Sequence, residues 1–397
     1  MRGGDVGDTA GDGSSDLYLT DALLSDEDRA IRDRVRRFCD RDVRPVINGY
    51  WERAEFPFAL LPKLAALDVC GGTHTGYGLP GLTPLQSGLV SMELARGDGS
   101  VSTFHGVHSG LAMNAIALLG SEEQKERWLG PMARIELVGA FALTEPDHGS
   151  DAVALETRVR RLGDGYVIDG DKRWIGNAVF ADLMVVWARD AQGDVGAFVV
   201  EKGAPGVEAT LITGKIGKRA SWQADVVLHD VRVPAENRLP GATSFDDAAR
   251  VLASARPNIA WGALGHALAA YERAVAYVHE REQFGTPIAG FQITQFCLAK
   301  MLADLTCMRL LCMRLAELVA AGELTPAIAS LAKMHNAERA KAVVGEARDL
   351  LGGNGILLEN EVGRHLGDVE VVSTVEGTDI VHALIVGRQI TGLSAFH

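Results

Sequence analysis

The sequence predicts a fold of three domains, in which two helical domains flank a β domain. Apolar residues recur at the helical period over residues 17–138 and again over 242–397. Between them, over 139–241, the period shortens to that of strands, with β-branched residues and turn signals. A chain of 397 residues is long enough for two or three domains and a large core.

The chain opens with a polar segment that is followed by helical signals. Residues 1–16 are rich in Gly, Asp and Ser, and we expect them to form a disordered tail. Ser25 and Asp28 have the spacing of a capping pair at the start of a helix, which Pro45 is predicted to end. Residues 111–119 form an apolar run that predicts a buried helix in the same domain.

The central segment has the pattern of an all-β domain. Residues 157–161 and 166–169 are joined by a Leu-Gly-Asp-Gly turn, which predicts a hairpin. Residues 183–187 and 197–201 are short and rich in apolar and β-branched residues, as buried strands are. Residues 226–233 alternate between apolar and polar before a proline, which predicts the last strand.

The last domain has the pattern of a helical bundle. Leu268, Tyr271 and Val275 fall on one face of a long predicted helix. Thr325 and Pro326 are an N-cap followed by a proline at the first position of another helix. Several long amphipathic helices with short connections are typical of a bundle.

Composition and charge exclude several classes of function. A net charge of −13 indicates no basic face for nucleic acid and disfavours binding to anionic membranes. No segment is apolar enough over the length of a bilayer span, and no signal peptide is recognised, so we expect a cytoplasmic protein. The 5 cysteines form no C-x-x-C pair and are expected to be buried thiols, and no metal-binding spacing occurs.

A single acidic residue stands in an apolar context near the end of the sequence. Glu376 lies in a turn of small residues, and its carboxylate is costly to bury unless it is paired or takes up a proton. Glu376 is therefore a candidate general base. Arg256 interrupts the apolar helical segment 251–264 and needs an acidic partner, for which Glu376 is one candidate. Its neighbour Ala255 cannot act as an alternative base.

Two segments of the central domain have the composition of a ligand-binding site. Residues 141–151 carry hydroxyl groups, a proline that fixes a turn and a glycine that lets backbone N–H groups approach a ligand. The alternative is an ordinary loop between domains. Trp174 follows a strand, where an indole can lie against an aromatic cofactor, and the alternative is a core residue.

Two further segments come from the last domain. Arg281 closes a long helix, and Gln292 follows a Gly-Thr-Pro turn at a spacing that suits a pyrophosphate clamp. The alternative is a solvated helix end. Residues 351–355 are rich in glycine but follow a helix and not a strand, so they are no dinucleotide-binding fingerprint and a nicotinamide dehydrogenase is disfavoured. Alone, they are typical of a helix C-cap.

Taken together, five segments resemble the acyl-CoA dehydrogenase family. They are residues 141–151, 174–175, 281–285, 351–353 and 376–378, and they occur in the family's order and at its spacing. The resemblance covers nearly the whole chain. Within the family, the sequence resembles the glutaryl-CoA dehydrogenase branch most. It implies an N-terminal α-helical domain, a central β-barrel domain and a C-terminal four-helix bundle, assembled as a homotetramer or a dimer.

The resemblance also implies FAD as the cofactor. The positions that match flavin contacts are Phe141, Leu143, Thr144, Gly149, Ser150, Trp174, Ile175 and Gly176. Those that match contacts to the ADP part, from a neighbouring subunit, are Arg281, Phe284, Gln292, Leu351, Gly352 and Gly353. Thr378 would touch the FAD phosphates, and Phe396 would lie nearby. The positions that match contacts to the acyl-CoA are Ser102, Thr103, Ser150, Leu252, Arg256 and Gly377.

The implied reaction is the α,β-dehydrogenation of an acyl-CoA thioester. Glu376 removes the α-proton and the β-hydrogen leaves as hydride to flavin N5. The backbone N–H of the base and a ribityl hydroxyl polarise the thioester oxygen. Electron-transfer flavoprotein is the expected electron acceptor. The alternatives are an acyl-CoA oxidase, a dehydrogenase of acyl groups linked to a carrier protein, and a catalytically inactive member of the family.

Five positions bear on the acyl group and the flavin. The Arg-Ser pair that grips the distal carboxylate in the glutaryl branch aligns with Ser102 and Thr103, so we expect no efficient oxidation of glutaryl-CoA. The flavin-facing threonine of most relatives is Gly176 here, and the aromatic residue that precedes the base is Val375, which opens space beside the acyl chain. His105 falls in the pocket-lining stretch, which suggests a branched or polar acyl group.

Overall fold

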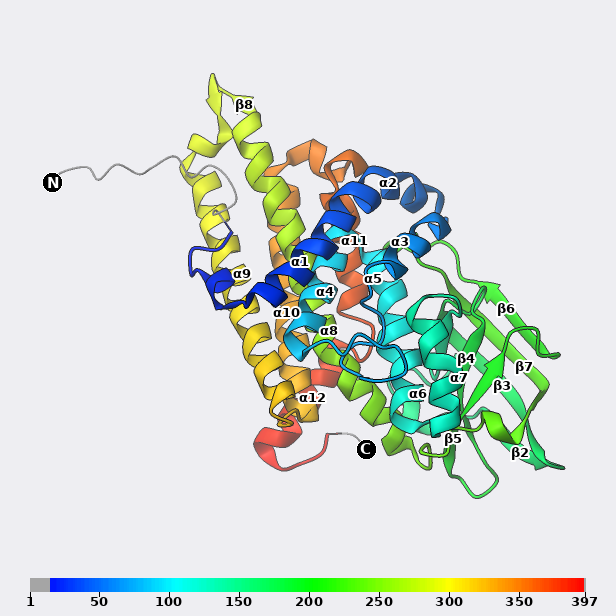
Figure 1. Ribbon diagram of the computed structural model, residues 1–397. Coiled ribbons are helices and arrows are strands. Elements are labelled where there is room, and N and C mark those ends of the chain that lie inside the picture. The colour runs from blue at the N-terminus through cyan, green and yellow to red at the C-terminus, as the bar shows by residue number, and fades with distance from the viewer. Residues whose placement is uncertain (1–14, 396–397) are drawn as a thin grey trace.

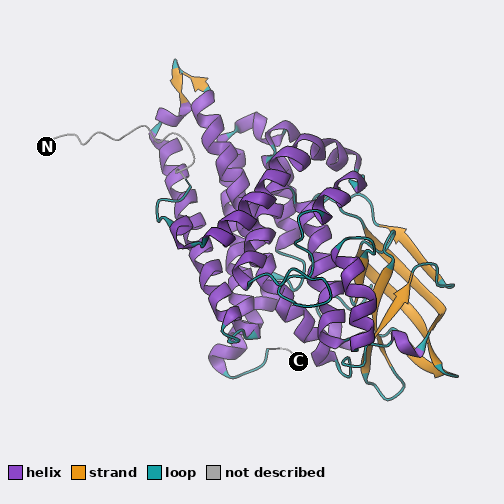
Figure 2. Cartoon of the chain, in the orientation of Figure 1, coloured by secondary structure: helices purple, strands orange, loops and turns teal. Residues whose placement is uncertain are grey.

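The computed structural model describes residues 15–395, and the expected order of a helical, a β and a second helical part is confirmed (Figure 1). The sheet lies at one end of the molecule and the long C-terminal helices at the other, with N-terminal helices packed between them (Figure 2). Most of the expected tail, residues 1–14, lies outside the described residues, as does Phe396.

The N-terminal part consists of short helices joined by tight connections. They are α1 (Asp26–Phe38), α2 (Arg44–Arg53), α3 (Leu61–Ala65), α4 (Pro84–Gly97), α5 (Gly99–His105), α6 (Asn114–Leu119) and α7 (Glu122–Ala133). Ser25 and Asp28 form the predicted capping box, because each side chain accepts the backbone N–H of the other residue, both at 3.1 Å.

The prediction that Pro45 ends the first helix is wrong. A π-helical turn, Cys39–Val43, joins α1 to α2, and Pro45 lies in the first turn of α2. Proline is tolerated there because the N–H that it lacks has no helical acceptor in a first turn. A second π-helical segment, Gly106–Met113, joins α5 to α6. Such segments are frequent at functional sites, which directs attention to the helix that contains the second one.

The β part is one seven-stranded sheet. Its strands are β1 (Gly139–Ala142), β2 (Arg158–Leu162), β3 (Gly165–Gly176), β4 (Leu183–Arg189), β5 (Val195–Glu201), β6 (Val207–Leu211) and β7 (Gln223–Val233). They follow the order β1-β4-β2-β3-β7-β6, and β5 also pairs with β4. β2 and β3 form the predicted hairpin, with Leu162 opposite Gly165. β1 runs parallel to β4 and leads directly into the loop that was expected to bind flavin.

Three long helices dominate the C-terminal part. The helices are α8 (Phe245–Glu280), α9 (Gln292–Ala320), α10 (Pro326–Leu350), α11 (Val362–Val372) and α12 (Asp379–Thr391). A hairpin of β8 (Glu282–Gln283) and β9 (Thr286–Pro287) projects beyond the end of α8 (Figure 1). α8 also packs tightly on α4, since a Cβ at Gly265 would lie 2.1 Å from the carbonyl oxygen of Met92. The predicted cap of α10 is confirmed, because Thr325 Oγ1 accepts the N–H of Ile328 at 3.2 Å.

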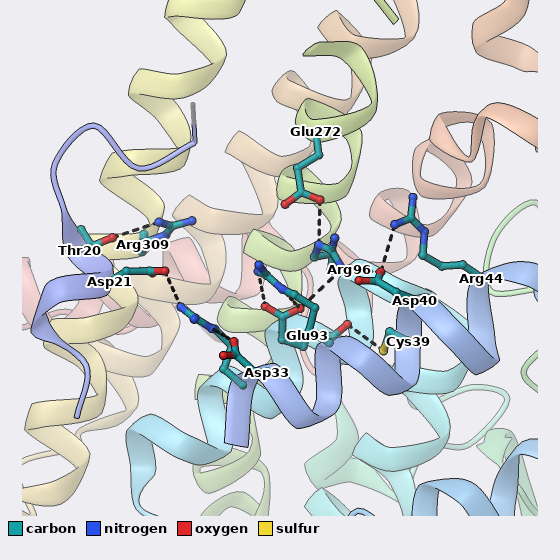
Figure 3. Close-up of polar contacts among 12 residues, drawn as sticks. Thr20, Asp21, Asp33, Cys39, Asp40, Arg44, Glu93, Arg96, Glu272 and Arg309 are labelled. Atoms are coloured by element: carbon teal, nitrogen blue, oxygen red, sulfur yellow. Dashed lines mark hydrogen bonds and ion pairs between the residues drawn. The ribbon is translucent and has the colours of Figure 1, made fainter. Parts of the chain in front are cut away.

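Ion pairs fill the space between α1, α4 and α8 (Figure 3). Glu93 is wholly buried and accepts two hydrogen bonds from Arg36, at 2.8 and 3.0 Å. Arg96 contacts Glu272 at 2.8 Å and Asp40 at 3.0 Å. A cavity of about 450 Å³ borders this network. Because these charges neutralise one another, we interpret the ion pairs beside the cavity as structural. The candidate functional site lies elsewhere.

Within residues 15–395 no helix is long and apolar enough to cross a bilayer, and no cluster of His, Cys, Asp and Glu side chains is placed to hold a metal ion. The cysteines are free, and three of them are buried as expected. The expectation of a buried thiol is wrong for Cys307, which is exposed on α9, and Cys297 is half-buried.

Candidate active site

Glu376 lies on the loop that joins α11 to α12. Its φ of 54° and the φ of 101° at Gly377 both lie in the left-handed region. Although Glu376 as a whole is only half-buried, its Oε2 is buried and has no hydrogen-bond partner in the described part of the chain. The main-chain N–H of Glu376 likewise donates to no acceptor among residues 15–395. The same residue therefore presents a free carboxylate oxygen and a free donor.

Burial controls the protonation of Glu376. Removal from water raises the pKa of its carboxyl group from 4.5 to about 7, and the nearby cations Arg256, Lys218 and Lys333 oppose this rise without cancelling it. A carboxyl group with a pKa near 7 is present in both forms at neutral pH, and it accepts a proton more readily than an ordinary glutamate. These are the properties of a general base.

Arg256 contacts the loop of Glu376, but it does so through the main chain. Its Nε donates to the carbonyl oxygen of Glu376 at 3.4 Å. Burial lowers the pKa of Arg256, and the charge of Glu376 acts in the opposite direction. Leu252, one turn earlier on α8, is half-buried against an apolar cluster that includes Phe141. Arg256 thus holds the loop that carries Glu376, residues 373–378, which we call the base loop. It also adds positive charge beside this loop.

Two lysines near Glu376 were not found by sequence reasoning. Lys218, on the loop between β6 and β7, is buried with a φ of 46°, and its N–H donates to Asp368. Lys333, in the middle of α10, is wholly buried, and its Nζ donates to the carbonyl oxygen of Gly377 at 2.9 Å. Burial lowers the pKa of both lysines. Lys333 had a signal in the sequence, since it is a charge on the alanine-rich face of a helix, whereas Lys218 stands in a polar loop.

The loop expected to bind flavin is held by a buried ion pair. Lys172 Nζ lies 2.8 Å from Glu145 Oε1 and donates to the carbonyl oxygen of Leu143 at 3.0 Å. Both charged side chains are buried. Glu145 also accepts the N–H groups of Glu156 and Thr157, at 2.6 and 2.9 Å. The loop is therefore tied to β3 on one side and to the segment before β2 on the other.

The side chains of this loop differ in exposure. Phe141 and Leu143 are buried, Thr144 is half-buried, and Ser150 is exposed. The carbonyl oxygen of Thr144 accepts the N–H of Arg173 at 2.9 Å, which joins the loop to β3 a second time. The hydroxyl-bearing residues thus lie toward the surface, on a backbone that two contacts fix.

The end of β3 presents an indole to solvent. Trp174 is 51% exposed and has a φ of 65° at an irregularity in the β3–β7 pairing. The alternative that Trp174 is a core residue is therefore wrong. Ile175 is buried, and a Cβ at Gly176 would lie 2.8 Å from Val107, which leaves no room for a side chain there. A Cβ at Gly149 would meet no described atom within 4 Å. The exposed indole and the open glycine suit a flat ring system.

One face of the helix from α5 through the following π-helical segment borders open space. The residues on this face are Ser102, Thr103, Gly106, Val107 and Gly110, which are half-exposed on a helix that is otherwise buried. A Cβ at Gly106 or Gly110 would meet no described atom within 4 Å beyond its own helix. We call this face the acyl stripe, because Ser102 and Thr103 match acyl-CoA contacts of the family. Its side chains are small and uncharged. The stripe therefore has room for an apolar chain and no cation of its own for a distal carboxylate.

His105 does not belong to the acyl stripe. Its side chain is buried, and its Nε2 lies 3.3 Å from the carbonyl oxygen of Val69. Burial lowers the pKa of His105, which favours a neutral imidazole. The expectation that this histidine lines the acyl pocket is wrong, because its position on the helix turns it toward the N-terminal core.

The segments expected to hold the ADP part of FAD lie at the opposite end of the bundle from α12 (Figure 1). Arg281, Phe284 and Gln292 are exposed around the β8–β9 hairpin. Gly352 and Gly353 are exposed beyond the end of α10, while Leu351 is buried. One chain therefore does not bring these residues together with its own base.

Thr378 and Gly377 follow the base directly. Thr378 Oγ1 accepts the N–H of Val381 at 3.3 Å and so caps α12. A Cβ at Gly377 would lie 2.9 Å from the ring of His382. These two residues shape the base loop, so Thr378 has a structural task besides the phosphate contact that was expected of it.

Comparison with known proteins identifies the family. Models of the N-terminal, middle and C-terminal domains of acyl-CoA dehydrogenases match residues 25–136, 140–231 and 245–391. The mitochondrial short-chain specific acyl-CoA dehydrogenase of Bos taurus is 33% identical over 374 residues, which cover 92% of this chain and 90% of that protein. The chain belongs to the acyl-CoA dehydrogenase family.

Two solved structures of this family resemble the chain over nearly its whole length. A glutaryl-CoA dehydrogenase from Mycobacterium smegmatis has a TM-score of 0.94 and 43% identity, and the match covers 97% of this chain and 100% of that one. A glutaryl-CoA dehydrogenase from the same organism in complex with FADH2 has a TM-score of 0.95 and 38% identity, with the same coverage. The order and arrangement of the three parts are therefore those of the family.

Proposed function

We propose that the chain catalyses the FAD-dependent α,β-dehydrogenation of an acyl-CoA thioester, with Glu376 as the general base. The observation that carries this proposal is the state of Glu376. Its carboxylate oxygen is buried without a described partner, and burial raises its pKa to about 7. Family membership supports the reaction class, and the geometry of this loop supports the choice of base.

The residues present fit FAD. The exposed indole of Trp174 and the open space beside Gly149 suit the flavin ring and a close approach of the backbone. Thr144 is half-buried and Ser150 is exposed, so their hydroxyl groups are available to donate hydrogen bonds. Bound FAD supplies the acceptor for the β-hydrogen. The buried pair Lys172–Glu145 holds the loop on which these groups stand.

Two groups of Glu376, its carboxylate and its main-chain N–H, have separate functions in the proposed reaction. Glu376 takes the α-proton, which is only weakly acidic, so negative charge on the thioester oxygen must be stabilised. The main-chain N–H of Glu376 has no acceptor among the described residues, which leaves it available to that oxygen. Substrate binding expels water and strengthens both interactions. Arg256 binds the carbonyl oxygen of Glu376, and Gly377 follows the base directly. Both residues are proposed to position the thioester.

The acyl group is proposed to be uncharged at its far end. Ser102 and Thr103 replace the cationic clamp of the glutaryl branch, and Thr103 Oγ1 already donates to the carbonyl oxygen of Gly99 at 2.8 Å. Gly106 and Gly110 leave space for an extended or branched chain. Although glutaryl-CoA dehydrogenases are among the related structures, we therefore propose a short or branched acyl-CoA without a distal carboxylate.

Electron-transfer flavoprotein is proposed as the electron acceptor, and a homotetramer or dimer as the active assembly. The separation of the two groups of FAD-matching residues supports the assembly, because another subunit must supply Arg281, Phe284, Gln292 and the glycines after α10. The acceptor rests on family membership alone. Rapid reoxidation of the reduced enzyme by oxygen would instead mark an oxidase.

An anaerobic flavin-bleaching assay tests the proposed function. The purified holoenzyme is mixed with butyryl-CoA, isovaleryl-CoA and glutaryl-CoA, and the visible flavin absorbance is followed. We expect bleaching by butyryl-CoA or isovaleryl-CoA and none by glutaryl-CoA. Formation of crotonyl-CoA and carbon dioxide from glutaryl-CoA would refute the proposed acyl class. A colourless protein without flavin would refute the function itself.

The variant Glu376→Gln tests the base. We expect it to keep FAD and to lose roughly 10²- to 10⁴-fold or more in turnover, the range that general-base catalysis provides. Glu338→Gln, a change of an exposed glutamate on α10, is the matched control. Turnover of Glu376→Gln at the rate of the control would show that another group removes the proton.

A further inference from the structure

A buried lysine on α10 reaches the loop that carries the base. The side chain of Lys333 is wholly buried. Its Nζ donates to the carbonyl oxygen of Gly377 at 2.9 Å and contacts Asp379 Oδ1 at 3.1 Å. These two partners stand on either side of Thr378, directly after Glu376. One ammonium group therefore ties together both ends of the short segment that follows the base.

The segment that Lys333 holds has an unfavourable backbone conformation. A residue other than glycine is rarely stable in the left-handed region, and Glu376 has a φ of 54°. Gly377 follows with a φ of 101°, a region that other residues rarely enter. Such a conformation persists only where the surrounding structure holds it. The contacts from α10 supply that restraint.

A second contact from the same helix supports the same loop. Ser330 lies one turn before Lys333, and its Oγ is hydrogen-bonded to Nδ1 of His382 at 3.0 Å. Both of these residues are wholly buried. The ring of His382 in turn lies so close to Gly377 that a Cβ there would come within 2.9 Å of it. Two polar side chains on one face of α10 therefore restrain the base loop, Lys333 directly and Ser330 through His382.

We propose that Lys333 is a positioning residue of the dehydrogenation, which fixes the base loop so that the carboxyl group and the main-chain N–H of Glu376 both face the substrate. The inference rests on the proposed role of Glu376 as the base. Arg256 binds the carbonyl oxygen of Glu376, and Lys333 binds that of Gly377. Both peptide groups that follow the base are therefore restrained, while its own N–H stays free. Lys333 acts through the loop and not on the reacting atoms.

The charge of Lys333 has a separate effect on the base. A positive charge beside Glu376 favours the carboxylate and holds its pKa below the value that burial alone would give. Without that charge, a smaller fraction of the enzyme has the base ionised at neutral pH. A buried ion pair remote from the base would weaken the protein when broken but would not move the pH profile of the reaction.

Lys333→Met in the holoenzyme tests the proposal, with Lys341→Met as its matched control. Lys341 lies on the same helix and pairs with Glu370 at 2.7 Å, but both side chains are partly exposed. The probe is whichever of butyryl-CoA and isovaleryl-CoA the wild-type enzyme oxidises faster. For Lys333→Met we expect kcat to fall by roughly 10- to 100-fold with KM changed by less than about threefold, as for a misplaced catalytic group. FAD content should equal that of the control.

Two further readouts separate positioning from stability. In Lys333→Met the pKa seen in the pH profile of kcat/KM should rise, and amide hydrogen exchange of residues 373–382 should become faster. Asp379→Asn removes one of the two partners of Lys333, so hydrogen exchange of residues 373–382 should become faster by a smaller factor than in Lys333→Met, and kcat should fall by less. Because this change is mild, it also decides the question if Lys333→Met fails to fold.

The outcomes distinguish the two proposals. If Lys333→Met matches Lys341→Met in kcat, pH profile and hydrogen exchange, Lys333 is not a positioning residue. The same conclusion follows if Asp379→Asn leaves both kcat and the hydrogen exchange of residues 373–382 at the control values. Glu376→Gln is measured beside them. Its turnover at the control rate would refute the proposed base, whereas its inactivity together with a normal Lys333→Met would refute only the role of Lys333.

Discussion

At the scale of single residues, the free carboxylate oxygen of Glu376 and its raised pKa have the same origin. A buried carboxylate is usually paired directly with a cation, which lowers its pKa and occupies its oxygens. Here Arg256 and Lys333 bind carbonyl oxygens of the loop instead. Their charges are close enough to keep ionisation accessible, and the described contacts leave Oε2 free. The arrangement therefore preserves a base that still accepts a proton.

The stability of the protein should report on this residue through pH. The folded pKa of about 7 lies above the ordinary 4.5, so the folded state keeps a proton that the unfolded chain releases. The free energy of unfolding therefore falls as pH rises between these two values. We expect Glu376→Gln to melt above the wild type at about pH 8 but not at about pH 5, by the equivalent of about 1–3 kcal/mol.

Thermal melts of the two holoenzymes at both pH values make this measurement. Glu338→Gln, whose side chain is exposed, should show no such pH-dependent difference. A difference between Glu376→Gln and the wild type that is equal at both pH values would contradict the raised pKa.

Sequence reasoning selected the proposed base at this scale but did not find all of its surroundings. Glu376 stood out as a charge in an apolar context, and Arg256 as a charge in an apolar helix. Lys218 and Lys333 come from a loop of the sheet and from α10, which only the folded chain brings to Glu376. A role for the main-chain N–H of Glu376 was expected only from the family resemblance, since its freedom depends on a left-handed φ that the residue type does not indicate.

At the scale of elements, a buried ion pair makes the largest set of contacts to the loop that is expected to bind flavin. Lys172 joins β3 to the carbonyl oxygen of Leu143 and to Glu145, and Glu145 holds the segment before β2. Removal of one partner of a buried pair leaves the other charge uncompensated, at a cost of about 3–5 kcal/mol. The loop that carries Thr144 and Ser150 should then lose its fixed shape.

We therefore expect Lys172→Met to bind FAD at least about tenfold more weakly than the wild type, because part of the binding energy must reorder the loop. Lys202→Met is the control, since Lys202 pairs with Asp182 at 3.1 Å in the same domain but is exposed. The ratio of flavin to protein absorbance after gel filtration gives the result. Equal flavin retention in the two variants would show that the loop does not need the pair.

The spacing of apolar residues along the sequence predicted most helices and strands. The predictions failed where an element is locally distorted. Pro45 does not end its helix, because a π-helical turn precedes it. Trp174 is not in the core, because β3 is irregular there and its φ is 65°. His105 faces the N-terminal core and not the acyl stripe. A pattern of apolar positions describes regular elements and contains no information about such irregularities.

At the scale of the whole molecule, most of the residues that match FAD contacts lie in two separate groups, while Thr378 stands at the start of α12 (Figure 1). One lies at the sheet, around Trp174, and the other lies around the β8–β9 hairpin. Large apolar side chains are exposed near the second group, with Phe284 at 96% and Ile293 at 70%. Exposed apolar surface next to matched cofactor residues is expected where another subunit covers it. Each group is a local motif that the sequence shows directly, whereas their separation was expected only from the family resemblance.

Complementation between two inactive chains tests whether subunits share the site. A chain with Arg281→Glu keeps its base but damages the ADP contacts, and a chain with Glu376→Gln keeps the ADP contacts but lacks the base. Each should be inactive as a homo-oligomer. If the ADP contacts come from a neighbour, a mixed oligomer contains sites that combine an intact Glu376 with the neighbour's intact Arg281.

We therefore expect co-expressed chains with two different tags, purified through both, to regain FAD and up to about half of the wild-type activity, since only one of the two kinds of site is complete in a symmetric pair. The two variants purified separately and mixed without exchange of subunits should stay inactive, which controls for trace wild-type enzyme. If each chain instead built its whole site from its own residues, no site in the mixed oligomer would be intact. Inactivity of the doubly purified oligomer would thus show that Arg281 serves the base of its own chain or does not serve FAD.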